Sequence, residues 1–277
     1  MALQGIFYHY HRLLLSEYEK ALWSCDWDRK LGQPYWDWTL DTASEADFLA
    51  SPVFQTVRGF GGNGPYIPGN LSHPELPGFV GGPPFDIPDR SGGGCIANGP
   101  FAGFTTLLGP QNMSTGTTPR CIRRDFSYHS LANSASPLQV EQAMLNITDF
   151  GSFELITDTT TFHPGGHWAI GGLYGTMTDT YTSPADPLFW LHHSNMDRAW
   201  WSWQMRDMAV REFDIAGPLV FFDYANKIAG NVTLATPVWV GLNTTTRVEH
   251  PAGDLMHPRK GPLCYTYDQL YGYEEED

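Results

Sequence analysis

The chain has 277 residues, of which 42% are hydrophobic and 14% aromatic, and its formal net charge is −14. This length and composition predict one globular domain over residues 1–277 with a sizeable core. The negative charge argues against nucleic acids and anionic membranes as partners, and no apolar run approaches the ~20 residues of a membrane-spanning helix. We therefore expect neither nucleic-acid nor membrane partners.

Sequons and cysteines indicate a secreted protein. Five sites fit the glycosylation pattern Asn-x-Ser/Thr: Asn70, Asn112, Asn146, Asn231 and Asn243. The four cysteines lie far apart without a Cys-x-x-Cys pair, which argues against a zinc–thiolate site and favours one or two disulfides. Residues 1–25 carry several charges and no uninterrupted apolar run, so they do not form a signal peptide. We expect a secreted glycoprotein whose first segment is missing from this sequence.

The first predicted element is an amphipathic helix over residues 6–23, where Phe7, His11 and Leu14 share a face. His9 cannot share the face of His11, so we interpret it as an exposed or neighbouring side chain. The QPYWDWT segment over residues 33–39 predicts aromatic core packing. Residues of about 50–125 are rich in glycine and proline and predict irregular loops. A short helix is predicted over residues 137–149.

Two histidines four residues apart, His163 and His167, fall on one side of a helical turn and can bind one metal ion. His193 lies on a second predicted helix. The residues that share its face are apolar: Phe189, Met196, Trp200 and Trp203. Three imidazoles without a thiolate or carboxylate suit copper or zinc. For any one of these histidines, a core position bonded to a backbone carbonyl is the alternative.

The spacing His-x-x-x-His, followed by Asp-Pro-x-Phe-x-x-His-His-x-x-x-Asp-Arg-x-Trp, resembles the copper B half of type 3 copper proteins. These are the tyrosinases, catechol oxidases and hemocyanins. The strings SGGGCIANGPF and PRCIRRDF resemble those of short, secreted fungal members. The resemblance implies a mainly α fold, in which a helical bundle holds a dicopper site among long irregular loops with little β structure. The copper B helices would cover about residues 162–205.

The resemblance also implies a set of metal ligands. His163, His167 and His193 would bind copper B, with His192 as a neighbour. The helix over residues 6–23 resembles the copper A helix, so His11 would be a copper A ligand and Arg12 the family's structural arginine. Two further copper A histidines are missing: Ala2 occupies the expected position of the nearer one, and the farther one would precede residue 1. Copper A is therefore incomplete, and we expect a chain truncated at its N-terminus.

Other residues receive roles from the same resemblance. Glu154, nine residues before His163, stands near the spacing of a family glutamate that holds the water for phenol deprotonation; an ordinary surface glutamate is the alternative. Pro164 occupies a position where members that hydroxylate monophenols often have asparagine, and it offers no side-chain donor or acceptor. This favours o-diphenols. The other residues expected to line the pocket or support the ligands are Trp168, Phe189, His192 and Asp197.

Residues near the C-terminus and the cysteines complete the implied set. Tyr265 and Tyr267 resemble a Tyr-x-Tyr motif that docks near the structural arginine. The fungal strings imply a disulfide between Cys95 and Cys121, which leaves Cys25 and Cys264 as a second candidate pair.

The implied function is that of a copper oxidase that uses O2 to oxidise o-diphenols, and in some members monophenols, to o-quinones. Three alternatives stay open. A hemocyanin-like protein would bind O2 reversibly, a mononuclear copper or zinc protein would use only the copper B histidines, and a secreted protein without activity would keep the fold for its surface.

Overall fold

The computed structural model describes residues 3–25, 27–68, 87–107, 109, 119–241 and 247–272. The chain forms two compact units: the first comprises residues 1–35, 138–163 and 193–277, and the second comprises residues 36–137 and 164–192. Two of the passages from one unit to the other lie inside helices, in α6 (Phe162–Gly171) and in α7 (Leu188–Met205). The single-domain organisation expected from the length stays a prediction.

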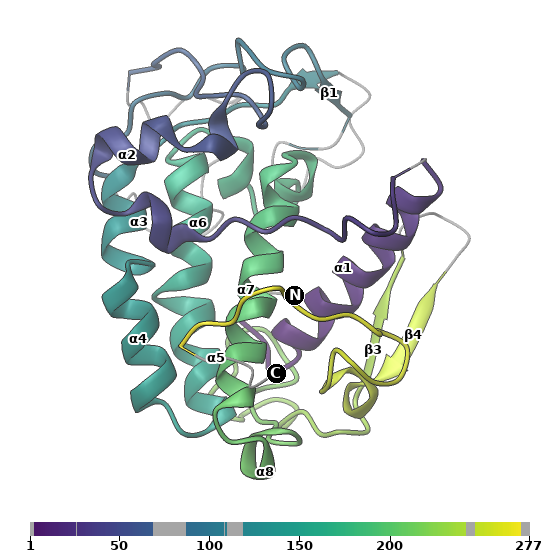
Figure 1. The fold of residues 1–277 in the computed structure, drawn as a ribbon. Coiled ribbons are helices and arrows are strands. Elements are labelled where there is room, and N and C mark those ends of the chain that lie inside the picture. Colours follow the sequence, from purple (N-terminus) through teal and green to yellow (C-terminus); the bar gives the residue numbers. More distant parts are fainter. Residues whose placement is uncertain are drawn as a thin grey trace. The chain divides into compact units, whose positions relative to one another are not determined.

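Most of the regular structure described in the first unit is helical. Besides parts of α6 and α7, it contains α1 (Phe7–Trp23), nearly all of α4 (Pro137–Asn146), α5 (Phe150–Thr159) and α8 (Met208–Arg211). A two-stranded antiparallel sheet, β3 (Pro237–Val240) and β4 (Val248–Pro251), pairs Val238 with His250. β3 lies against α1 (Figure 1). Along β3 the side chains of Val238 and Val240, on alternate positions of the strand, are buried.

The predicted helices of this unit are confirmed, and their ends have local causes. α1 begins at Phe7, within one residue of the expected start. α4 ends at Asn146 and not at residue 149, because Asp149 caps the next helix: its side chain accepts a hydrogen bond from the backbone N–H of Ser152. That helix, α5, was not expected from the sequence.

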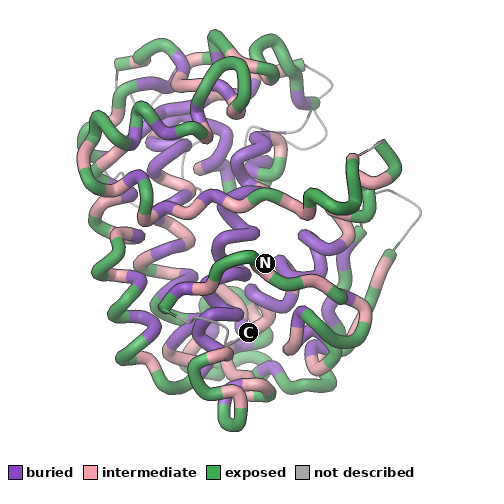
Figure 2. The backbone as a smooth tube through the Cα atoms, viewed as in Figure 1, coloured by how far each residue is buried: buried purple, intermediate pink, exposed green. Residues whose placement is uncertain are grey.

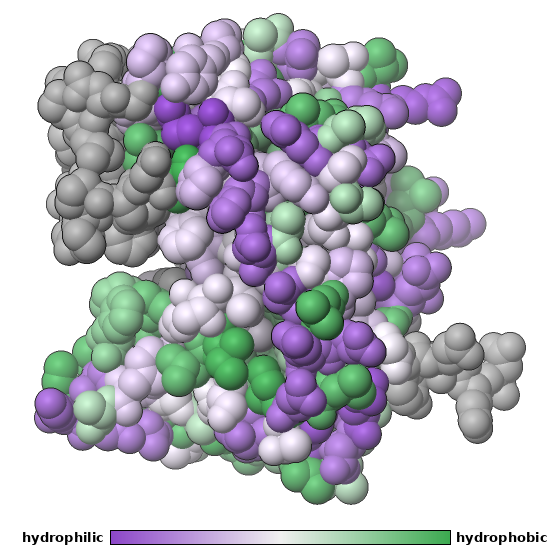
Figure 3. All heavy atoms as spheres, turned by 90° about the vertical axis from the view of Figure 1, so that its left-hand side faces the viewer, coloured by the Kyte–Doolittle hydropathy of each residue, from purple (hydrophilic) through white to green (hydrophobic). Residues whose placement is uncertain are grey.

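Burial distinguishes the inner helices from the outer ones. In α1, nearly every residue from Phe7 to Ser16 is buried, and every residue of α7 from Leu191 to Gln204 is buried (Figure 2). A helix buried on all sides lies in the interior. α4 instead exposes Leu138 and Leu145. On the face that Figure 3 shows, hydrophobic residues lie among hydrophilic ones.

The second unit combines short helices with irregular chain. Its elements are two 3-10 helices, Trp38–Asp41 and Pro52–Phe54, then α2 (Glu45–Ala50), β1 (Thr105–Thr106), β2 (Arg120–Cys121), α3 (Tyr128–Ser134) and two further 3-10 helices, Thr176–Thr178 and Ser183–Ala185. Between Phe54 and Tyr128 the described residues hold only the two-residue strands β1 and β2. The described part of the predicted loop-rich insert is irregular, and the bounds of the insert stay a prediction.

A disulfide and a buried arginine hold this loop-rich part together. Cys95 and Cys121 form a disulfide, as the sequence strings implied. Arg124 is fully buried and donates to both carboxylate oxygens of Asp186, at 2.8 and 2.9 Å. The Oδ1 of Asp186 also accepts a hydrogen bond from the N–H of Leu188, so it caps the start of α7. Among the described residues, no helix is long and apolar enough to cross a membrane.

Candidate metal centre

Three of the predicted ligands gather in the first unit around one phenylalanine. The ring centroid of Phe7 lies 4.5 Å from that of His11, 4.6 Å from that of His163 and 6.0 Å from that of His193. His11 and His193 stack with centroids 4.0 Å apart, and ring nitrogens of His163 and His193 lie within 4.8 Å of each other. Helical periodicity predicts that Phe7 shares a face with His11, but it does not predict that Phe7 lies near all three rings.

The δ nitrogens of three predicted ligands, His11, His163 and His167, contact protein oxygens. Nδ1 of His11 lies 2.9 Å from the carbonyl oxygen of Phe7, and Nδ1 of His163 lies 3.1 Å from that of Asp158. In the second unit, Nδ1 of His167 lies 2.5 Å from the carbonyl oxygen of Met177. A carbonyl only accepts hydrogen bonds, so each Nδ1 carries the proton. Each Nε2 is then the nitrogen with the lone pair that can bind a metal.

The helix that carries His163 and His167 depends on close packing at its glycines. A Cβ added to Gly165 would lie 2.3 Å from the Cβ of Ser134 on α3, and one added to Gly166 would lie 2.3 Å from the ring of His192 on α7. Larger residues would therefore push α6 away from both neighbours. This explains why two poor helix formers occupy the turn between the histidines.

His192 belongs to the packing around His167 in the second unit. The indole N–H of Trp38 donates to Nδ1 of His192 at 3.2 Å, and the rings of His192 and His167 have centroids 4.9 Å apart. Phe189 lies on the same side, with its ring centroid 6.1 Å from that of His167. Trp38 comes from the QPYWDWT segment, whose predicted core packing is confirmed because Trp36 and Trp38 are buried. Pro164 and Trp168 are half-buried on α6.

Burial keeps two histidines of the first unit, His163 and His9, uncharged at neutral pH. It lowers the pKa of His163 to about 4. It also lowers the pKa of His9 to about 3, with the Arg12 guanidinium adding to the effect. Metals bind the neutral imidazole, so this state of His163 suits a ligand. His9 is fully buried, with Nε2 3.0 Å from the sulfur of Met256; it is not exposed.

A pair of buried carboxyl groups lies beside His163 in the first unit. Glu154 and Asp158 are one turn apart on α5, and both are buried. The hydroxyl of Tyr224 donates to Glu154 at 3.0 Å. Burial, together with the charge of Asp158, raises the pKa of Glu154 to about 8. Burial also raises the pKa of Asp158, to about 7. Glu154 is therefore not a surface residue.

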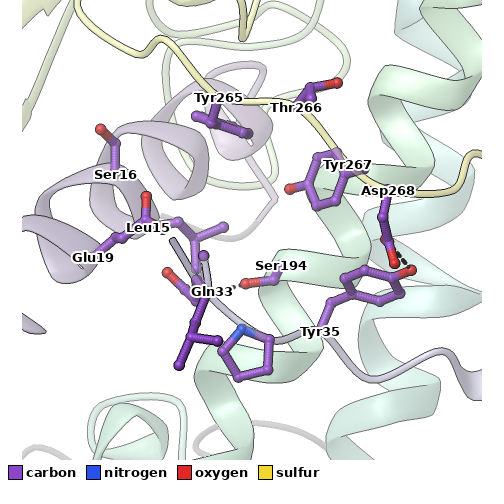
Figure 4. A pocket seen from close by; sticks show the side chains of 13 residues that line it. Leu15, Ser16, Glu19, Gln33, Tyr35, Ser194, Tyr265, Thr266, Tyr267 and Asp268 are labelled. Carbon is purple, nitrogen blue, oxygen red and sulfur yellow. Dashed lines mark hydrogen bonds between the residues drawn. The ribbon is translucent and has the colours of Figure 1, made fainter. Parts of the chain in front are cut away.

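A separate cavity of about 430 Å³ lies in the first unit, between α1, residues 31–35 and the C-terminal segment (Figure 4). Its walls contain none of the predicted metal ligands. Ser194, which follows His193, accepts a hydrogen bond from Gln33 at 2.6 Å, and Tyr35 donates to Asp268 at 2.7 Å. These polar groups bond one another across the cavity wall.

The histidine arrangement matches a known family. Residues 3–206 match the family described as the common central domain of tyrosinase. The chain belongs to the tyrosinase family. Members of this family bind copper through histidines, so the family implies copper as the cofactor and an oxidoreductase as the class of protein.

Several fungal tyrosinase-family proteins are similar to this chain. The tyrosinase-like protein phomQ1 of Diaporthe leptostromiformis is 32% identical, over 95% of this chain and 63% of its own length. Tyrosinase P of Aspergillus terreus is 31% identical, over 95% of this chain and 75% of its own length. The structure of polyphenol oxidase from Thermothelomyces thermophila, a G292N mutant, superimposes with a TM-score of 0.76 and 29% identity. It is covered over 74% of its length, and this chain over 97%.

These matches confirm the family and the mainly helical tyrosinase fold predicted from the sequence. The chain spans about two thirds of the first relatives, 63% of phomQ1 and 65% of phomQ1'. The roles of individual site residues stay predictions.

In this tyrosinase-family chain, Arg12 and the Tyr-x-Tyr motif meet at one carboxylate. Asp197 on α7 is buried, and its Oδ1 accepts a hydrogen bond from Nε of Arg12. Its Oδ2 accepts hydrogen bonds from the hydroxyls of Tyr265 and, at 2.7 Å, Tyr267. Arg12 also donates to the carbonyl oxygen of Leu255 at 3.0 Å. The motif thus reaches the arginine through Asp197.

The two remaining cysteines and two of the sequon asparagines are exposed. Cys25 and Cys264 are exposed free cysteines, so the second candidate disulfide is not formed. The thiol of Cys264 instead donates to the carbonyl oxygen of Gly261 at 3.5 Å. Asn146 and Asn231 are exposed, whereas Asn70, Asn112 and Asn243 lie outside the described residues. Ala2, which stands at the expected position of a copper A histidine, also lies outside them.

Proposed function

We propose that this chain is a copper oxidase that uses O2 to oxidise small o-diphenols to o-quinones. In this proposal His163, His167 and His193 bind one copper ion, and His11 belongs to the second copper site. The observation that carries the proposal is the shared orientation of His11, His163 and His167. Each fixes its proton on Nδ1 against a protein oxygen and presents Nε2 as the ligand nitrogen.

The donor set fits copper. Imidazole nitrogens suit copper, and burial keeps His163 neutral as metal binding requires. His163 and His167 are four residues apart on one continuous helix, so their separation is fixed by α6 itself. When bound, a pair of copper ions supplies the redox chemistry with O2 that side chains lack.

Pro164 supports diphenols over monophenols as substrates. It lies in the first turn of α6, directly after His163. It offers neither a side-chain hydrogen-bonding group nor a backbone N–H to orient a water molecule. Trp168, one turn further along α6, is half-buried, and we expect its indole to restrict the size of the phenol.

Glu154 remains our candidate for the group that accepts the phenol proton, in the ionised form that prevails above its pKa of about 8. Its burial beside Asp158 supports the assignment, because Asp158 in turn contacts His163. A proton taken up by Glu154 would therefore remain inside the first unit, in a hydrogen-bonded set that includes the hydroxyl of Tyr224.

Secretion is also part of the proposal. The Cys95–Cys121 disulfide supports it, since such bonds persist in oxidising compartments. The exposed sequons at Asn146 and Asn231 are accessible to glycosylation.

The decisive test combines metal content with turnover. The copper-loaded chain is analysed for copper per protein by elemental mass spectrometry, and catechol oxidation is followed on the same sample. We expect His193→Ala to lose more than about 100-fold in activity, because even partners outside the ligand set cost about 10–100-fold. His250→Ala, a half-buried histidine on β4, is the matched control and keeps full activity. Copper binding without oxidation of catechol would contradict the oxidase and favour an O2 carrier or a half-site protein.

A further inference from the structure

A carboxylate that the sequence patterns did not single out lies directly behind His163. Asp158 is 2% exposed, and its Oδ1 lies 2.7 Å from Nδ1 of His163. Asp158 belongs to the last turn of α5, and His163 is the second residue of α6. The N–H groups of Thr160 and Thr161 both bond the carbonyl oxygen of Ile156, which makes the connection tight. The short turn therefore fixes the carboxylate against the imidazole.

The His163 imidazole faces two oxygens of the same residue. Its Nδ1–H points at the carbonyl oxygen of Asp158, 3.1 Å away, although the carboxylate Oδ1 is closer. Oδ1 is fully buried and accepts no hydrogen bond from the described residues in this geometry. A small rotation of the ring would direct the same proton to the carboxylate. A buried acceptor without a hydrogen bond is costly, so this position calls for a donor.

The other side of the carboxylate is already occupied. Oδ2 accepts a hydrogen bond from the backbone N–H of Leu3, and a side-chain hydrogen bond joins Asp158 to Glu154. These contacts hold the carboxylate in place and leave Oδ1 directed at His163. His11 and His167 differ in this respect, because their Nδ1 atoms contact neutral backbone carbonyls.

We propose that Asp158 is a positioning residue for His163: its carboxylate accepts a hydrogen bond from Nδ1–H of His163, which orients Nε2 toward the metal and makes it a stronger donor. Carboxylate partners of this kind fix the tautomer of a ligand histidine and raise its basicity. The proposal rests on the proposed function in one respect, namely that His163 is a copper ligand. It adds a specific outer partner to one ligand of the site.

A purely structural role of Asp158 predicts a different effect of its replacement on folding stability and on copper affinity. Burying a second acidic group beside Glu154 costs free energy of folding, because both charges are removed from water. Asparagine has the same shape without the charge. If Asp158 positions a metal ligand, the metal-free Asp158→Asn variant should be at least as stable as the unchanged chain but should bind copper more weakly. If Asp158 is structural, the variant should lose stability.

The test measures Cu(II) affinity by chelator competition, together with urea unfolding of the metal-free chain. We expect Asp158→Asn to weaken Cu(II) binding by about 10–100-fold and to shift the Cu(II) electron paramagnetic resonance spectrum, with unchanged or higher stability. Asp158→Ser is the second variant and should give the same loss if asparagine disturbs packing. Asp149→Asn is the matched control on the same helix, because its exposed side chain only caps α5.

A double-mutant cycle separates the possible failures. In a His163→Ala background, Asp158→Asn should have no further effect on Cu(II) affinity, because its action passes through the imidazole. If Asp158→Asn leaves affinity unchanged while His163→Ala lowers it, the positioning role is overturned and the metal site stands. An equal loss in both backgrounds would also overturn it. If His163→Ala itself leaves affinity unchanged, the proposed metal site fails, and the role of Asp158 fails with it.

Discussion

Glu154 illustrates how burial changes the chemistry of a single side chain. An exposed glutamate is ionised at neutral pH, whereas burial beside Asp158 raises the pKa of Glu154 from 4.5 to about 8. The folded chain therefore holds a proton that the unfolded chain releases. Between these two values the folded state binds more protons, so the free energy of unfolding falls as the pH rises.

Replacing Glu154 should therefore weaken the dependence of the free energy of unfolding on pH. The stabilisation is fully present below about pH 4.5 and is lost as the pH approaches about 8. Glu154→Gln should make the pH-dependent fall smaller by more than about 1.4 kcal/mol, the equivalent of one pKa unit. Urea unfolding of the metal-free chain across this range measures the effect. Glu141→Gln on α4 is the exposed control and should leave the slope unchanged; equal slopes for both variants would contradict the burial of Glu154.

At the scale of elements, Asp197 connects α1, α7 and the C-terminal segment. Its two oxygens accept hydrogen bonds from Arg12 and from the hydroxyls of Tyr265 and Tyr267. Arg12 is fully buried, and the carboxylate of Asp197 compensates its positive charge. Breaking a buried ion pair from one side leaves an uncompensated charge in the interior.

We therefore predict that Asp197→Asn lowers the free energy of unfolding by about 3–5 kcal/mol. Tyr267→Phe removes one hydrogen bond to a charged group and should cost about 1.5–3 kcal/mol. Both are measured by urea unfolding. Tyr181→Phe, an exposed tyrosine in the second unit, is the control and should stay within about 0.5 kcal/mol of the unchanged chain. A Tyr267→Phe variant as stable as this control would show that the motif does not hold the C-terminal segment.

At the scale of the whole molecule, the disulfide compensates for the scarcity of regular structure in the loop-rich part of the second unit. Cys95 and Cys121 are 26 residues apart in sequence, and the described chain around them contains only very short strands. Closing such a loop restricts the unfolded chain. Replacing both cysteines by serine should lower the free energy of unfolding by about 3 kcal/mol. The matched control replaces the free cysteines Cys25 and Cys264 and should leave the urea midpoint unchanged.

The sequence predicted those features that depend on local spacing. The four-residue separation of His163 and His167, the face of α7 around His193 and the helical start at Phe7 all follow from helical periodicity. Asp158 escaped prediction because its contact with His163 depends on the turn between α5 and α6, and no periodicity encodes that turn. The interpretation of His9 as an exposed or neighbouring side chain rests on one buried face of α1, and an exposed position is wrong. The first three turns of α1 are buried on all sides.

Gly165 and Gly166 show a different limit of prediction from the sequence. Their poor helix propensity correctly indicated that something holds α6 in place, but propensity cannot name the partner. The structure identifies Ser134 and His192 as the close neighbours. Likewise, the Asp186-Pro187 string was recognised as a motif. That Asp186 both caps α7 and binds the buried Arg124 required the tertiary fold.

The two exposed thiols, Cys25 and Cys264, would limit the working lifetime of this chain if it oxidises o-diphenols as proposed. o-Quinones are electrophiles that add to thiolates, and exposed cysteines react through that form. If the proposed function holds, the exposed thiols of Cys25 and Cys264 are accessible to the quinones that the chain releases. Each adduct would remain on the protein, so the accumulated mass would record past turnover. Cys264 directly precedes Tyr265, which binds Asp197, so arylation there would reach the segment that holds the C-terminal end in place.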